Sequence, residues 1–180
     1  MTKAQATDLL ADAFDDATPS QAVRRVYVPH GRSILTIEQC EQKQKRNSTE
    51  QFVLTSFELN KGLRGDAKSF PVGESCTYFQ GFRFMEADMA ALKGFILAAY
   101  QSLDPKVKQV SKQMFLDAVG AKNALKGAVV VCDAWLHLSE KAKATGGKGF
   151  TKYNWRPATP EEIASLSIDD SGEEVSLDDL

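Results

Sequence analysis

The sequence lacks the residue patterns on which most metal, redox and hydrolytic sites depend. Its three cysteines, Cys40, Cys76 and Cys132, are far apart and form no C-x-x-C pair, so we expect small core residues and no zinc or redox centre. The two histidines have no candidate ligand partners at metal-binding spacing. Motifs typical of P-loop nucleotide binding, zinc metalloproteases and serine hydrolases are absent. We therefore expect a protein that is not an enzyme and needs no metal or cofactor.

Long apolar runs are also missing. No stretch approaches the roughly 20 apolar residues that a membrane-spanning helix needs. The first residues, MTKAQATDLLADAF, have neither the charged start nor the apolar centre of a signal peptide, so we expect a cytoplasmic protein. With 180 residues and 43% hydrophobic content, the chain has enough apolar side chains for one core, and we expect one domain with tails.

Positive charge is absent from the last 20 residues. Residues 161–180 contain eight acidic side chains and no lysine or arginine, which leaves 16 acidic against 22 basic residues in the first 160 positions. The sequence after Pro160 also has no sustained periodicity. We therefore expect three regions: an N-terminal arm (1–28) with a helical stretch at 7–17, a basic domain (29–159) and a disordered acidic tail (160–180).

What the sequence does contain is a succession of strand patterns interrupted by helix. Alternating apolar residues predict three strands, then two helical stripes ending at Leu103 and Gly120, then two more strands. The predicted strands are Ser33–Glu41, Gln51–Asn60, Glu74–Phe84, Ala128–Leu138 and Phe150–Trp155. The order βββαββ is that of the OB fold, so we expect a mainly β protein with helices, built on a five-stranded OB-fold barrel.

Two basic loops fall where OB folds bind their ligands. The loop after the first predicted strand is QKQKRNS, and the loop between the last two is SEKAKATGGKG. We expect both loops to flank one groove, although exposed loops also carry lysines merely for solubility. The cations proposed to contact a nucleic-acid backbone are Lys43, Lys45, Arg46, Lys61, Arg64, Lys141, Lys143, Lys148, Lys152 and Arg156.

Aromatic side chains lie beside these cations. Trp135 shares its strand face with Asp133 and His137, so it is either a stacking platform for bases or a ring that caps the barrel end. Tyr153 and Trp155 share one face of the last strand, opposite the face of Lys152 and Arg156. Either face is a candidate for the core, and we favour a binding role for the two rings. Tyr78, in the third strand, completes the set of candidate stacking residues.

The chain resembles a known family, the OB-fold single-stranded DNA-binding proteins of bacteriophages. The resemblance covers about Gly31 to Pro157, through the patterns GRSILTIEQCEQKQKRNSTEQFVLTSFELN and GKGFTKYNWRP. The end of the tail, Asp178-Asp179-Leu180, is similar to the acidic tip by which members of this family recruit partners. Many bacterial members end in an aromatic residue, whereas this chain has Leu180.

The resemblance implies a sequence-independent protein that coats single-stranded DNA during phage replication and recombination, in the cytoplasm of an infected bacterial host. Its acidic tail would recruit replication or recombination proteins. The alternative is an OB-fold module that binds a protein or RNA partner and has no role on single-stranded DNA. A preference for single strands over duplex distinguishes the two hypotheses.

Overall fold

The computed structural model describes residues 26–83, 85–147 and 149–166. Its centre is an antiparallel sheet with the strand order β3-β2-β1-β4-β5. The strands are β1 (Gly31–Gln44), β2 (Gln51–Arg64), β3 (Ser75–Gly81), β4 (Val129–His137) and β5 (Phe150–Pro157). The predicted mainly β architecture, with three strands, helix and two further strands, is confirmed.

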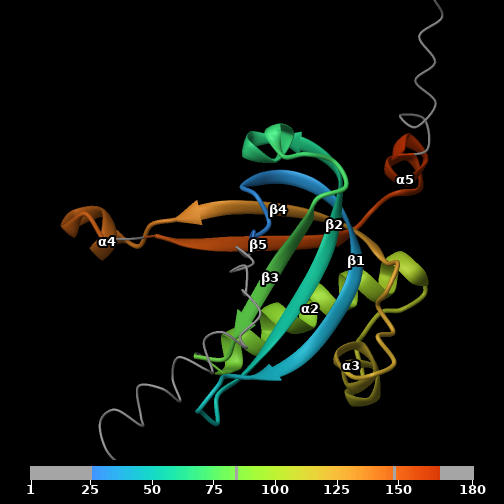
Figure 1. Ribbon diagram of the computed structural model, residues 1–180, viewed down its shortest axis with the longest axis horizontal. Coiled ribbons are helices and arrows are strands. Elements are labelled where there is room, and N and C mark those ends of the chain that lie inside the picture. Colours follow the sequence, from blue (N-terminus) through green and yellow to red (C-terminus); the bar gives the residue numbers. More distant parts are fainter. Residues whose placement is uncertain (1–25, 84, 148, 167–180) are drawn as a thin grey trace, which may run out of the picture.

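Helical segments lie in the connections that follow β2, β3 and β4 (Figure 1). A 3-10 turn, η1 (Gly65–Ser69), follows β2, and a short helix, α4 (Glu140–Thr145), caps the β4–β5 hairpin. The long connection from β3 to β4 holds α2 (Met85–Leu103) and α3 (Lys112–Val119). Ser111 starts α3 as its N-cap, where its side-chain oxygen accepts a hydrogen bond from the Met114 backbone N–H.

The main core lies between the concave face of the sheet and α2. Strands β1 and β2 are long and bent, with three register shifts where the ladder between them is irregular. The inward side chains of the sheet include Ile37, Val53 and Phe57, and all three are fully buried. From α2, Phe95 and Ile96 close this core.

The two edges of the sheet meet through side chains. The rings of Tyr78 from β3 and Tyr153 from β5 lie 5.0 Å apart, in an edge-to-face arrangement. The described strand pairings leave β3 and β5 as the edges. The structure is therefore a curled antiparallel sheet, and a closed ladder between β3 and β5 is not part of it.

The cysteines lie where the sequence predicts. Cys40, Cys76 and Cys132 are buried in the main core, each at 1% exposure or less. Burial raises the pKa of Cys40 to about 11 and that of Cys76 to about 12, because a thiolate is poorly solvated there. These thiols are therefore protonated, unreactive core residues. In the described part of the chain, none of the helices has both the length and the apolar character that crossing a membrane requires.

The expected disorder from Pro160 onward is wrong for its first seven residues, which form α5 (Pro160–Leu166). Thr159 and Glu162 start this helix as a capping box. The Glu162 backbone N–H donates to Thr159 Oγ1, and the Thr159 N–H donates to the Glu162 carboxylate. At its other end, Leu166 packs against a small cluster around Ile34 and Val131 on the outer face of the sheet. Residues 1–25 and 167–180, with most of the predicted arm and tail, lie outside the described residues.

Candidate nucleic-acid interface

The β4–β5 hairpin presents an exposed tryptophan next to a lysine. Val130, Cys132 and Ala134 of β4 face the main core, so alternation places Trp135 on the opposite, outer face. Its side chain is 44% exposed. The register pairs Trp135 directly with Lys152 of β5, which is also exposed. Directly paired residues have neighbouring side chains, so a ring and a cation share this face.

Two further rings lie toward the tip of the same hairpin. Phe150 is 54% exposed and contacts His137 of β4, with ring centroids 5.0 Å apart. The Lys152 ammonium lies 5.9 Å from the centre of the Phe150 ring, at the limit of a cation–π contact. Figure 1 shows β4 and β5 extending together from the body of the protein to α4. The outer side of this hairpin is thus a row of exposed rings and a lysine.

The basic loop at the tip of the hairpin forms helix α4 over most of its length. Lys143 lies within α4 and makes an exposed ion pair with Glu140, at 2.8 Å. Such pairs are weak in water, so Lys143 can exchange its partner for a phosphate at little cost. Lys141 belongs to the same helix, but its side chain lies outside the described residues, as does all of Lys148.

The β1–β2 turn carries the second set of predicted cations. Lys43 pairs with Glu41 at 2.5 Å, and Lys45 pairs with Glu50 at 3.1 Å. Arg46 is exposed at the tip of the turn. Two of the three cations are therefore partly neutralised by neighbouring carboxylates, so the positive potential of this turn is weaker than a count of its cations suggests.

A pair of phenylalanines beside this turn, Phe79 exposed and Phe52 half-buried, was missed by sequence reasoning. Phe52 of β2 and Phe79 of β3 lie on the outer face, with ring centroids 4.9 Å apart, and Phe79 is 45% exposed. Lys43 is the register partner of Phe52, so a cation again lies beside the rings. Alternation places Tyr78 and Phe79 on opposite faces but does not show which of them is outside.

The expectation that the two basic loops flank one groove is not supported. The β1–β2 turn follows Gln44 at one end of β1. The register pairs Ala134 with Gly31 at the other end, so β4 runs past the start of β1 before it reaches α4. The two loops therefore lie at opposite ends of β1, as Figure 1 also shows. They form two separate basic regions, each with its own exposed rings.

The proposed stacking role of three rings conflicts with their burial. Tyr78 is only 3% exposed, and burial raises the pKa of its hydroxyl. Trp155 is partly buried against the main core, where its ring stacks on Phe57 at 5.5 Å and meets Phe95 at 4.9 Å. Tyr153 stacks on Trp155 and is partly buried against the same core. The tyrosine–tryptophan face of β5 therefore points inward, and Lys152 and Arg156 point outward.

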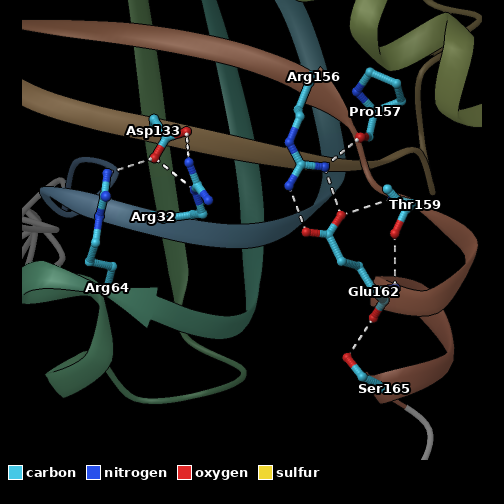
Figure 2. A network of polar contacts seen from close by, with 8 residues as sticks. All are labelled: Arg32, Arg64, Asp133, Arg156, Pro157, Thr159, Glu162 and Ser165. Carbon is cyan, nitrogen blue, oxygen red and sulfur yellow. Dashed lines mark hydrogen bonds and ion pairs between the residues drawn. The ribbon is translucent and has the colours of Figure 1, made fainter.

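Three arginines on the outer face are held by two carboxylates (Figure 2). Arg32 donates two hydrogen bonds to Asp133, at 2.9 and 3.0 Å, and the exposed Arg64 reaches the same carboxylate at 3.4 Å. Arg156 donates to both oxygens of Glu162, at 2.7 and 2.6 Å. Arg64 and Arg156, which we expected to contact the nucleic-acid backbone, thus take part in ion pairs within the protein.

The Arg156–Glu162 pair fixes α5 to the sheet. The Arg156 guanidinium, helped by the Thr159 N–H, lowers the pKa of the Glu162 carboxyl to about 2. In return, the carboxylate raises the pKa of Arg156. Lys61, the remaining predicted cation, is a partly buried residue of β2. The candidate tail residues Asp178, Asp179 and Leu180 lie outside the described residues.

Comparison with known proteins does not assign the chain to a family. No protein-family model matches the chain, and no curated protein sequence matches it significantly.

Proposed function

We propose that the protein binds single-stranded DNA without sequence preference, and that it coats exposed strands during phage replication and recombination. The observation that carries this proposal is Trp135, exposed on the outer face of the β4–β5 hairpin directly opposite Lys152. An exposed ring beside a cation suits an unpaired strand, because bases stack on the ring while the cation contacts the phosphate. Duplex DNA keeps its bases stacked on one another and gains little from such a ring.

The curled sheet would act as an OB-type barrel that offers its outer face to the strand. The hairpin supplies one ring region through Trp135 and Phe150, and the outer face of β2 and β3 supplies a second through Phe52 and Phe79. Each region has a lysine next to its rings, Lys152 in the first and Lys43 in the second. Stacking contributes about 1–3 kcal/mol per base, so two such regions are sufficient for sequence-tolerant binding.

The test is a competition assay with fluorescein-labelled oligothymidine. We expect unlabelled mixed-sequence single strands to displace the label at much lower concentration than the matching duplex. The affinity should fall with salt, with a slope of about −0.7 for each phosphate neutralised. No binding at low salt would refute the proposal. Better displacement by RNA of the same sequence would favour the alternative, an RNA-binding module.

In this proposal, the acidic end of the chain recruits replication or recombination proteins. Asp178 and Asp179 supply charge, and Leu180 supplies an apolar anchor for a basic pocket on a partner. A chain that stops after Leu166 keeps α5 and is the proper test of this role. It should bind oligothymidine at least as tightly as the full chain, because a tethered polyanion no longer competes with the strand. Retention of the same host proteins by both chains would exclude recruitment through this end.

A further inference from the structure

An apolar cavity lies between α2 and α3, on a part of the protein that the proposed DNA contacts do not use. Its volume is about 350 Å³. Apolar side chains from α2, from the residue before the α3 N-cap and from α3 itself form its walls: Met89, Leu92, Ile96, Val110 and Phe115. Met89 remains 39% exposed at the mouth. An apolar cavity of this size within reach of solvent is typical of a site that another side chain or peptide fills.

The charges at the cavity are all positive. Lys93 of α2 and Lys112 of α3 are its charged lining residues, and both are exposed. Within 26–83, 85–147 and 149–166, neither lysine takes part in an ion pair, unlike Lys122, which follows α3 and pairs with Asp117 of that helix. Apolar walls with two free ammonium groups fit an occupant that combines apolar side chains with carboxylates.

The chain itself contains a segment of that chemistry. Residues 7–17, TDLLADAFDDA, have Leu9, Leu10, Ala13 and Phe14 at helical spacing. The same eleven residues include four aspartates and no basic side chain. An amphipathic helix whose apolar stripe enters a groove between two helices is a recurring recognition mode. The acidic stretch 167–180 matches less well, because its apolar residues do not recur at helical spacing.

The acidic segment is joined to the described part of the chain by a short linker. Val26 lies beside β3, where its carbonyl accepts a hydrogen bond from the Thr77 N–H. Eight residues, 18–25, separate it from the end of the acidic segment, and when extended they span about 26–29 Å. We propose that residues 7–17 of the chain dock as an amphipathic helix in the α2–α3 cavity, with Lys93 and Lys112 beside their aspartates. This inference is independent of DNA binding.

Hydrogen exchange of the full chain, read by mass spectrometry, tests the docking. Two variants add the same charge to the same segment: Leu10→Asp lies on the apolar stripe, and the matched control Ala11→Asp lies off it. Leu10→Asp should weaken docking by about tenfold to hundredfold, with faster exchange in both 7–17 and the cavity walls. Ala11→Asp should change exchange by less than about twofold. Equal exchange rates in the two variants would overturn the proposal. So would amides of residues 7–17 that show no protection from exchange in the native chain.

A second comparison tests the charges and the rival occupants. Replacing Lys93 and Lys112 by glutamate should speed exchange of 7–17 by about threefold to fivefold, since two exposed charge pairs are lost. Faster exchange at the cavity walls after truncation at Leu166 would instead assign the cavity to residues 167–180. Protection that falls on dilution, together with dimers in light scattering, would assign it to another copy. Either result would contradict docking of residues 7–17 within one molecule.

Discussion

Replacing Glu162 by glutamine should weaken the attachment of α5 to the sheet without unfolding the domain. In the native protein, the two carboxylate oxygens of Glu162 accept hydrogen bonds from Arg156 at 2.7 and 2.6 Å. Glutamine keeps one acceptor and loses the charge. The matched control is Glu161→Gln, which removes an equal charge from the same helical turn but has no contact with Arg156. Both variants weaken the interaction with the helix dipole, so their difference reports the contacts of Glu162 with Arg156 and with the Thr159 N–H.

The magnitude follows from the geometry and exposure of the pair. A bidentate, charge-assisted contact contributes more to stability than an ordinary surface ion pair. The side chains of Arg156 and Glu162 are 38% and 22% exposed, so solvent screens part of the attraction. We therefore expect Glu162→Gln to weaken the attachment of α5 by about 1–2 kcal/mol. This change corresponds to an increase of about fivefold to thirtyfold in the opening equilibrium of the helix.

The same pair should make the attachment of α5 depend on pH. The pKa of the Glu162 carboxyl in the folded protein, about 2, is below its ordinary value of 4.5. The ion pair therefore contributes its full stabilisation above pH 4.5. It is lost as the pH falls from about 4.5 to about 2. Amide exchange across residues 160–166 at pH 7 measures the opening, and a carbon-13 titration of the Glu162 carboxyl measures the pKa. A midpoint near 4.5, or equal exchange in Glu162→Gln and Glu161→Gln, would refute the reasoning.

Two further predictions concern the candidate interface. Trp135→Ala should raise the Kd for oligothymidine by about 5-fold to 150-fold, the equivalent of 1–3 kcal/mol of stacking, as measured by fluorescence anisotropy. Leu116→Ala, at a similarly exposed site on α3, should leave the Kd unchanged, and equal losses in the two variants would point to a general effect on folding. Replacing Lys43, Lys45 and Arg46 together by alanine should weaken binding and flatten its salt dependence, although by less than three phosphate contacts, because two of these cations already have carboxylate partners. An unchanged salt slope would remove the β1–β2 turn from the interface.

The strands could be predicted from sequence because their signal is local. Alternation predicted a first strand over Ser33–Glu41, and the observed strand, Gly31–Gln44, extends it by a few residues at each end. The direction in which a face points is not a local property. Trp155 lies inside because Phe57 and Phe95, from a distant strand and helix, pack against its ring. The β5 sequence alone therefore could not show which of its two faces packs against the core.

Composition misled the prediction for α5, although a local signal was present. The acidic residues after Pro160 indicated disorder. The spacing Thr159-x-x-Glu162, however, is that of a capping box, and Arg156 supplies the carboxylate with a partner from the preceding strand. The separation of the two basic loops needed the register of β1 with β4, which depends on long-range pairing that no single segment encodes.

The central claim, that an exposed ring on the β4–β5 hairpin stacks on unpaired bases, is tested most directly by tryptophan fluorescence. The chain has two tryptophans, and only Trp135 is exposed, since Trp155 is packed between rings of the core. Titration with oligothymidine should quench the emission of Trp135, and the variant Trp135→Phe should lose this quenching while it still binds the strand. Saturating binding with no quenching in the native protein, or quenching that persists in Trp135→Phe, would contradict the claim.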